Sequence, residues 1–178
     1  MNAKLQQLFD KIEDQKQDLF EMISNLSAEQ INEKPLSGKW SISEIISHLI
    51  TAEKLSVNYI QKKIQGVNTV KNSGLFEELK MLVLKISQRI EGLKFKAPGY
   101  VVNNTVVYSD IAELKKEWSK TREDFRQLLE RMEDKHLEKK IYKHAIAGYL
   151  NIQHALMFFR EHVTHHRPQI GKLIKTLK

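Results

Sequence analysis

Apolar residues recur at every third or fourth position over four long stretches of this chain, which is the spacing that places side chains on one face of an α-helix. The stretches cover about 3–26, 41–66, 110–132 and the part from residue 151 onward. The 178 residues include only seven Gly and three Pro, few for a chain of many strands and turns. We therefore predict an all-α fold, a four-helix bundle with long connections and an additional short helix, formed by a single domain over residues 1–178.

Three of the four helices begin at a recognisable capping residue. Ser41 and Glu44 form a capping box, in which the Ser41 hydroxyl accepts from an early backbone amide and Glu44 accepts from the amide of Ser41. Asp110 and Asn151 carry side chains that accept hydrogen bonds from the first amides of a helix. These residues predict where the second, third and last helices start.

The connections between the helices have weaker patterns. Residues 27–39 are polar and contain a proline, and residues 133–150 form a second connection without a clear period. Within residues 66–109, the apolar spacing of residues 75–90 predicts a helix. Residues 92–110 predict a long irregular connection with short extended pieces.

Composition excludes several classes of protein. The chain has no Cys, which removes disulfide scaffolds, thiolate metal sites, iron–sulfur clusters and a cysteine nucleophile. A chain of this kind is typical of a reducing compartment, and residues 1–9 contain no apolar run of signal-peptide length, so we expect a cytoplasmic protein. An apolar stretch of about 18 residues, which would predict a membrane-spanning helix, does not occur.

The net charge of +7 raises the question of a nucleic-acid partner. The basic residues, however, are spread along the chain in short groups, and no block of five or six like charges occurs. Nucleic-acid binding would require Lys and Arg clustered on one face with aromatic residues among them, and the sequence has no such stripe. We therefore expect neither nucleic acid nor a membrane as a partner.

Four of the seven histidines lie within residues 153–167. His162 and His166 are four residues apart, so a helix places both on one face about one turn apart, a separation that allows two imidazoles to bind one metal ion. His165 is about 100° away around the helix and is expected to be exposed or at the edge of the site. The two histidines share one ridge of the helix with the apolar residues Ala155, Phe159 and Ile170. This predicts that both rings point toward the core.

His48 occupies a comparable position on the second helix. It follows Ile45 by three residues and precedes Ala52 by four, and therefore lies on an inward stripe. A bundle could bring His48 opposite His162 and His166. Three neutral nitrogen ligands would leave coordination positions open, as a catalytic metal site requires.

Spacing alone leaves a second interpretation open. A core-facing histidine is more often a hydrogen-bonded core residue than a ligand, and histidine pairs four residues apart occur by chance in many helices. Three inward imidazoles are difficult to satisfy with protein partners alone, whereas one divalent ion uses a lone pair from each ring. This cost of burial favours the metal site.

Three further residues have both a functional and a structural interpretation. Trp40 precedes the cap of the second helix and either covers a pocket or packs against the core. Glu53 lies about 140° around the helix from His48, which argues against a direct general base and favours a salt bridge. Tyr149 is a candidate to contact an anionic group of a substrate, and it too can be an ordinary surface residue.

Two segments of the chain resemble the signatures of the DinB-like (YfiT-like) superfamily. The N-terminal segment reads Pro35-x-x-Gly38-Lys39-Trp40-Ser41-Ile42-x-Glu44-Ile45-x-x-His48-Leu49, with Glu53 following. The C-terminal segment reads His144-x-x-x-Gly148-x-Leu150 and leads into Phe159-x-x-His162-x-x-x-His166-x-x-Gln169-Ile170. The two halves are separated much as they are in that family, and together the resemblance covers nearly the whole chain.

The resemblance implies a DinB-type four-helix bundle with a divalent metal, commonly nickel or zinc, held by His48, His162 and His166. It also implies a homodimer and a small-molecule substrate. Characterised members of the family include S-transferases that use low-molecular-weight thiols such as bacillithiol or mycothiol, and a mycothiol-dependent isomerase. Others are described as metal-dependent hydrolases. We therefore expect a metal site that activates a thiol cosubstrate or water, with a non-catalytic, metal-stabilised binding or stress-response module as the alternative.

The chain departs from the family pattern at two positions. Pro168 replaces a residue that is often small, and because proline has no amide proton it predicts a kink or break just beyond His166. His144 is followed by Ala145, where the family frequently has a His-Pro pair. This second departure leaves open whether His144 reaches the site.

Overall fold

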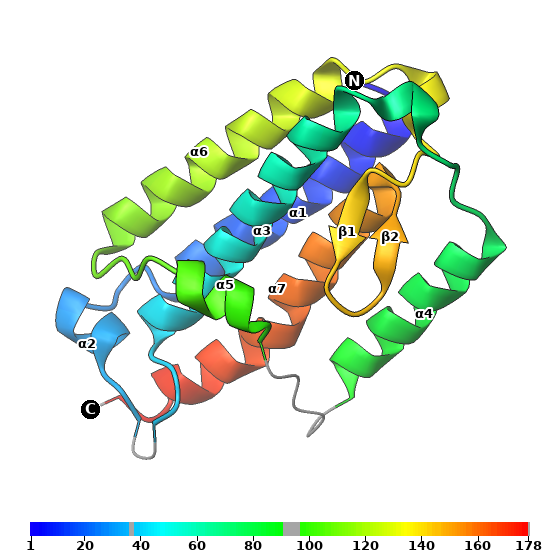
Figure 1. Ribbon diagram of the computed structural model, residues 1–178. Helices are drawn as coiled ribbons and strands as arrows, with labels where there is room; N and C mark the ends of the chain where they lie inside the picture. The colour runs from blue at the N-terminus through cyan, green and yellow to red at the C-terminus, as the bar shows by residue number, and fades with distance from the viewer. Residues whose placement is uncertain (36–37, 91–96, 178) are drawn as a thin grey trace.

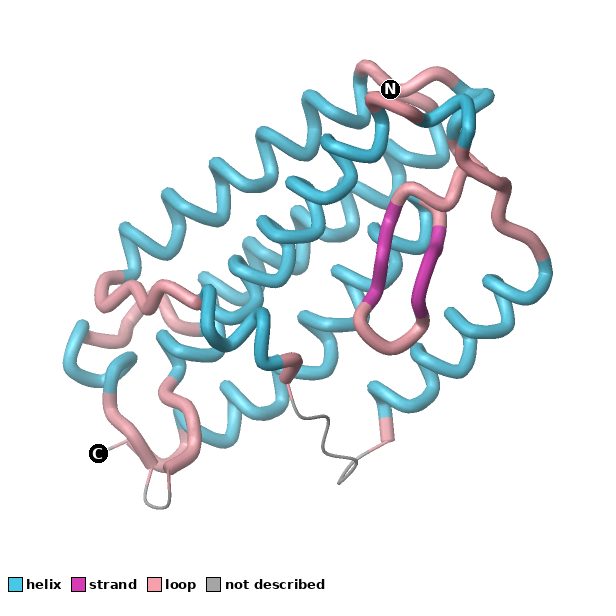
Figure 2. The backbone as a smooth tube through the Cα atoms, viewed as in Figure 1, coloured by secondary structure: helices cyan, strands magenta, loops and turns pink. Residues whose placement is uncertain are grey.

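The computed structural model describes residues 1–35, 38–90 and 97–177. Its main elements are four long helices that lie side by side (Figures 1 and 2): α1 (Ala3–Met22), α3 (Ile42–Ile64), α6 (Ile111–Glu130) and α7 (Ile152–Ile174). The predicted four-helix bundle is therefore confirmed. Within the described ranges, no helix combines the length and the apolar character needed to cross a bilayer.

The direction of the chain explains the long connection in its middle. The colours in Figure 1 show that α1 and α7 run one way and that α3 and α6 run the other way. Because α3 and α6 are parallel, the chain has to return along the bundle before α6 begins, and α4 (Leu75–Arg89) makes this return. The short helix α5 (Gly99–Asn104) then packs against α3.

The remaining elements are short. They are α2 (Ala28–Asn32), the 3-10 helices η1 (Val67–Thr69) and η2 (Asp134–His136), and an antiparallel hairpin of β1 (Tyr142–His144) and β2 (Gly148–Leu150). Gly148 has a φ of +76°, a conformation that glycine adopts without strain. The strand β1 packs against both α3 and α7. This small hairpin is the exception to an all-α fold that is otherwise confirmed.

The first helix is shorter than its apolar pattern predicts. α1 ends at Met22, before Leu26, and the predicted connection at 27–39 contains the helix α2. The pattern overestimates the helix because Ile23, which already lies in the following turn, is also buried in the core. Apolar spacing therefore located the helix but not its last residue.

The prediction for residues 92–110 is wrong in part. Residues 91–96 lie outside the described part of the chain. Residues 99–104 form the helix α5 instead of the expected extended pieces. Pro98 starts this helix, because its carbonyl oxygen accepts from the amides of Val101 and Val102 at 2.9 and 3.1 Å.

The last helix passes through Pro168 without interruption. The missing amide proton of the proline predicts a kink or break just beyond His166, but α7 continues to Ile174, so the predicted break does not occur. Val163, before the proline, and Ile170, after it, are buried in the same apolar cluster. Packing on both sides thus holds the helix together despite the lost hydrogen bond.

The core consists of two apolar clusters with polar residues between them. One cluster joins the first halves of α1 and α7 to the second halves of α3 and α6, and the other cluster joins the opposite halves. Between the clusters, α3 and α6 contribute the buried ion pair of Glu53 with Arg122, and α7 contributes His162. The middle of the bundle is therefore its polar layer.

Candidate metal centre

The helix α3 carries His48 into the bundle. It begins at the predicted capping box, in which the Ser41 amide donates to Glu44 Oε2 at 2.8 Å and the Glu44 amide donates to Ser41 Oγ at 3.2 Å. From this start, His48 falls on the same inward face as Ile45 and Ala52, both of which are buried. Only 4% of the surface of His48 is exposed.

The helix α7 carries the other two candidate ligands. Asn151 caps it as predicted, because Asn151 Oδ1 accepts from the amide of His154 at 3.0 Å. His162 and His166 follow on the ridge that the sequence identifies, and both are buried. The residue at which α7 begins therefore determines which side of the helix carries His162 and His166. The capping box does the same for His48 on α3.

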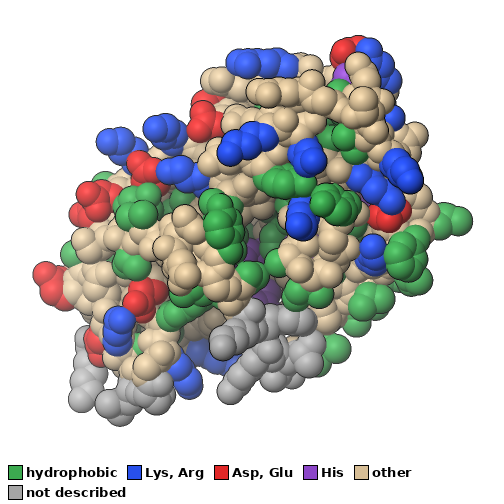
Figure 3. Space-filling view, in the orientation of Figure 1, with side chains coloured by type: hydrophobic (Ala, Val, Ile, Leu, Met, Phe, Trp, Pro, Cys, Tyr) green, Lys and Arg blue, Asp and Glu red, His purple; other side chains and the backbone are tan. Residues whose placement is uncertain are grey.

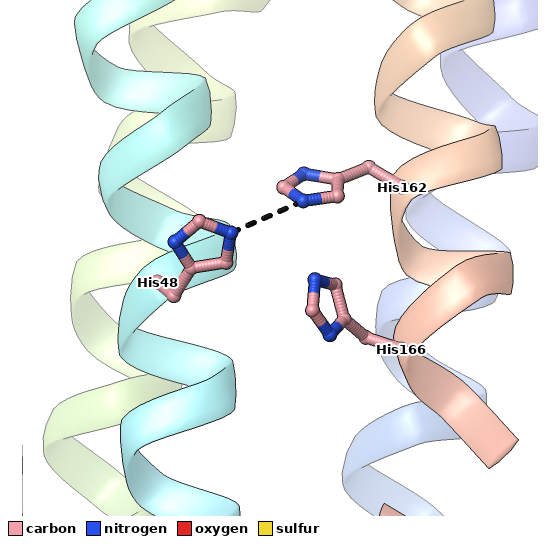
Figure 4. Close-up of side chains that lie close together, drawn as sticks. All are labelled: His48, His162 and His166. Atoms are coloured by element: carbon pink, nitrogen blue, oxygen red, sulfur yellow. Dashed lines mark hydrogen bonds between the residues drawn. The ribbon is translucent and has the colours of Figure 1, made fainter. Parts of the chain in front are cut away.

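The structure brings the three histidines together (Figure 4). The rings of His48, His162 and His166 point into one space between α3 and α7. Their centroids are 5.0, 5.3 and 4.9 Å apart. One nitrogen of each ring lies within 4.8 Å of the others, so within the described chain these residues form a group that could hold a metal ion.

The spacing of the nitrogens fits a shared divalent ion. Imidazole nitrogens bind zinc at about 2.0–2.1 Å, so two ligands at a tetrahedral angle are about 3.3 Å apart. Nε2 of His48 and Nε2 of His162 are 3.2 Å apart. The same distance suits a hydrogen bond from one ring to the other, so it is compatible with an ion without requiring one.

Burial keeps the three rings neutral. Desolvation lowers the pKa of His48 to about 4, with a smaller effect from His165. Burial, followed by the neighbouring His48 ring, lowers the pKa of His166 to about 3. Burial, followed by repulsion from His166 and His48, holds the pKa of His162 well below its usual range. A neutral imidazole offers the free lone pair that a metal ion needs.

Aromatic side chains cover two of the rings. The ring centroid of Trp40 lies 4.9 Å from that of His48. Phe158 stacks on His162, with the centroids 5.0 Å apart and an angle of 21° between the planes. Trp40 also packs against the core cluster at that end of the bundle, which agrees with its structural interpretation.

The outer nitrogens of the rings differ in their partners. Nδ1 of His166 lies 3.0 Å from Gln169 Oε1, and donating a proton to this oxygen leaves the lone pair of His166 on Nε2, which faces the other two rings. The Nδ1 atoms of His48 and His162 are buried, with no hydrogen-bond partner among the described residues. Buried polar atoms without partners are uncommon in an ordinary core, which favours a functional role for these rings.

A hollow lies in the surface between the region of α5 and the hairpin, and histidine atoms are visible at its bottom in Figure 3. Hydrophobic side chains gather on both sides of this hollow. Exposed apolar residues of the two elements include Tyr100 and Val102 on α5 and Ile146 in the hairpin turn. The three candidate ligands themselves are 4–9% exposed.

Glu53 is held away from the histidines by a buried ion pair. Its two carboxylate oxygens accept from Arg122 Nε at 2.6 Å and Arg122 Nη2 at 2.7 Å. Trp118 Nε1 donates to the same carboxylate at 2.8 Å. The structural interpretation of Glu53 as a salt-bridge residue is the one that the structure supports.

The two hairpin candidates lie outside the three-histidine group. His144 is buried, and its Nδ1 accepts from the amides of Ile146 and Ala147 at 3.2 and 3.1 Å. Its ring centroid is 4.4 Å from that of Phe158, which stacks on His162, and His144 is also among the neighbouring histidines that lower the pKa of His162. Tyr149 is 49% exposed.

His165 lies at the edge of the cluster, as predicted. Its ring centroid is 5.0 Å from that of His166. Its Nδ1 lies 2.9 Å from the backbone carbonyl oxygen of Gln88 and donates to it. This hydrogen bond ties α7 to the end of α4 beside the candidate ligands.

Sequence reasoning assigned no role to Phe158 or to Gln169. Phe158 stands four residues before His162, and Gln169 stands three residues after His166. Both therefore lie near the face that carries the rings. The same spacing of three or four residues that identifies the candidate ligands could therefore have identified Phe158 and Gln169 as their neighbours.

Comparison with known proteins agrees with the fold. No curated protein and no solved structure gave a match. The sequence profile of the DinB superfamily, however, matches residues 11–170, a range that includes all three histidines. Because this match spans well over half of the chain, the protein belongs to the DinB superfamily.

Proposed function

We propose that the protein is a metal-dependent enzyme in which His48, His162 and His166 hold a nickel or zinc ion for attack on a small electrophile. The supporting observation is that three buried, neutral imidazoles converge, with one nitrogen of each ring within 4.8 Å of the others. Three nitrogen ligands leave positions for a cosubstrate, which distinguishes a catalytic site from a closed structural one. Nitrogen ligands suit both nickel and zinc, so the donor set does not select between them.

The nucleophile in this proposal is a thiol or water. A divalent ion at the site supplies a Lewis acid that lowers the pKa of the thiol or water. The chain has no Cys, so a sulfur nucleophile has to come from a low-molecular-weight thiol cosubstrate, and the protein is then an S-transferase. With water as nucleophile it is a hydrolase. We place it in the cytoplasm, where free thiols stay reduced.

The surrounding residues have distinct roles in this proposal. Trp40 and Phe158 cover two of the candidate ligands, exclude water from their sides and give the substrate apolar surface. Gln169 accepts from His166 Nδ1 and so keeps the Nε2 lone pair of His166 directed into the site. Glu53 is not the general base of a hydrolase, because its carboxylate is committed to Arg122.

Elemental analysis of the purified protein tests the site. We expect about one divalent ion per chain in the wild type and a large loss in His166→Ala. The matched control is His165→Ala, which removes the adjacent ring at the edge of the cluster and should retain the ion. Equal metal content in the wild type and in His166→Ala would remove the site assignment.

An activity screen tests the chemistry separately. The metal-loaded protein is assayed with a set of low-molecular-weight thiols and small electrophiles, and product is measured with and without thiol. Thiol-dependent product that is absent in His166→Ala supports an S-transferase, and thiol-independent turnover supports a hydrolase. If no pair reacts in the presence of bound metal, the catalytic proposal fails.

A second candidate function is a non-catalytic bundle that the metal stabilises, serving as a binding or stress-response module. It is favoured by the fact that the candidate ligands come from two helices, α3 and α7, so a shared ion would crosslink them. In this case a chelator lowers the melting temperature while no reaction is found in the screen.

A further inference from the structure

The helix α4 has two faces of opposite exposure. The face toward the bundle buries Glu77, Met81 and Leu84, and the helix packs there against α7. The opposite face carries an apolar stripe at helical spacing whose members are 51–89% exposed. We call it the α4 stripe: Leu75, Leu79, Leu82, Val83, Ile86 and Ile90. Hydrophobic side chains are visible along this edge of the molecule in Figure 3.

The α4 stripe is larger than the apolar patches of typical monomers. With the adjacent Phe76, which is 65% exposed, it presents on the order of 700 Å² of apolar surface, against about 300–600 Å² for the largest patch on a typical monomer. A standard protein interface buries about 800 Å² on each partner. The stripe alone therefore approaches the area that a stable association needs.

The helix is also held firmly in place, so it cannot rotate to bury the stripe against its own bundle. Glu77 Oε1 is 2.8 Å from Lys140 Nζ. Arg89 donates twice to the buried carboxylate of Glu161, at 2.7 and 2.9 Å. These contacts attach both ends of α4 to the rest of the protein and keep the stripe facing outward.

The pattern of the stripe suits a second copy of the same helix. If two copies of α4 pack antiparallel around a two-fold axis near Leu82, the stripe of each covers the stripe of the other, and Leu79 faces the partner's Ile86. Glu78, whose Oε1 accepts from His154 Nε2 of its own chain at 3.0 Å, lies on the same flank of the stripe as Lys85, so this arrangement brings opposite charges of the two copies to the same rim. The stripe itself contains no charged residue, as expected for the centre of an interface.

We propose that the α4 stripe is the surface through which two copies of this chain associate in antiparallel fashion around Leu82. This inference concerns a face distinct from the histidine cluster and does not depend on the proposed enzymatic function. A lipid surface is the competing occupant, because Lys80 and Lys85 flank the stripe. The area of the stripe, which approaches that of one side of a standard protein interface, and its self-complementary pattern favour the second copy.

Light scattering coupled to size exclusion tests the association. The wild type should have about twice the chain mass of 20.8 kDa, and Leu82→Glu should have the mass of a single chain. Leu82 is already exposed within one chain, so the substitution should leave the helical circular dichroism unchanged. Val106→Glu, which places the same charge at an exposed apolar residue outside α4, is the matched control and should keep the doubled mass.

Crosslinking tests the register. Since the natural chain has no Cys, Leu82→Cys introduces a single thiol close to the proposed axis, and mild oxidation should give a covalent dimer. Val106→Cys should remain largely uncrosslinked. A wild type of single-chain mass, or Leu82→Glu that keeps the doubled mass, would overturn the proposal. Binding of a single-chain wild type to anionic phosphatidylserine vesicles, lost in Leu82→Glu, would assign the stripe to lipid instead.

Discussion

Nε2 of His48 lies 3.2 Å from Nε2 of His162, although the two residues are 114 positions apart in the chain. The capping residues Ser41 and Asn151 set where α3 and α7 begin, and thereby set which side of each helix carries the rings. The packing of α3 against α7 then sets the distance between them. The candidate site thus depends both on local helix starts and on the contact of two remote helices.

The metal-free protein should lose stability as the pH falls below about 6.5. Burial lowers the pKa of His48 and His144 to about 4 and that of His166 to about 3, from an ordinary value of 6.5. Between pH 6.5 and about 4 the unfolded chain therefore binds more protons than the folded chain, and acid favours unfolding by up to about 1.4 kcal/mol per pH unit for each histidine.

Urea unfolding in the presence of a chelator, at about pH 7.5, 6 and 5, measures this dependence. His144→Phe removes one buried titrating ring and should make the loss of stability with falling pH shallower. A free energy of unfolding that stays constant or rises toward pH 5 would contradict the prediction.

Gln169→Ala should weaken metal binding without removing a ligand. Gln169 Oε1 accepts from Nδ1 of His166, and loss of such an outer partner typically costs about 10–100-fold in metal affinity. Competition with a chelator of known affinity measures the change. Gln169→Glu retains an acceptor oxygen and should bind close to wild type, whereas unchanged affinity in Gln169→Ala would show that the contact does not orient the ring.

Glu53→Ala should destabilise the fold rather than the metal site. The substitution leaves the Arg122 guanidinium, which is 1% exposed, without its main carboxylate partner. Removing one member of a buried ion pair costs about 3–5 kcal/mol of unfolding free energy. The double variant Glu53→Ala, Arg122→Leu should recover part of this loss. If Glu53→Ala keeps full stability but loses bound metal, the prediction is wrong and Glu53 takes part in the metal site.

Pro168→Ala should raise the stability of the last helix. It restores an amide that can donate to the carbonyl of Thr164, and we expect a gain of about 1–2 kcal/mol after the greater freedom of the unfolded chain is subtracted. Thermal unfolding measures the gain, and metal content serves as the control, because His162 and His166 both precede the substitution. A lower melting temperature would show that the proline is required where it stands.

The helix α4 shows what the spacing of apolar residues can and cannot predict. The spacing of residues 75–90 correctly predicts a helix. It does not say which face is covered, and the face that packs on the bundle is the one with Glu77 and Met81, while the regular stripe through Leu82 and Ile86 faces outward. An apolar stripe indicates that something covers it, and the sequence does not distinguish the chain's own core from another surface.

The hairpin and α5 were missed for a related reason. β1 and β2 have three residues each, too few to show the alternation that marks a strand. β1 lies where it does because Tyr142 and His144 are buried against neighbouring helices, which come from distant parts of the chain. Short elements of this kind are stabilised by what they pack against rather than by their own pattern.

The amino-acid sequence by itself determined the four long helices, the residues that start three of them and the three histidines on inward faces. These features depend on hydrogen bonds and side-chain spacing within a few positions, so neighbouring residues in the sequence are enough to determine them. Only the tertiary structure decided that Glu53 belongs to Arg122, that the three rings meet in one space, and that α4 turns its apolar stripe outward. Each of these outcomes is a contact, or a missing contact, between residues far apart in the chain, and such contacts are selected by how whole helices pack.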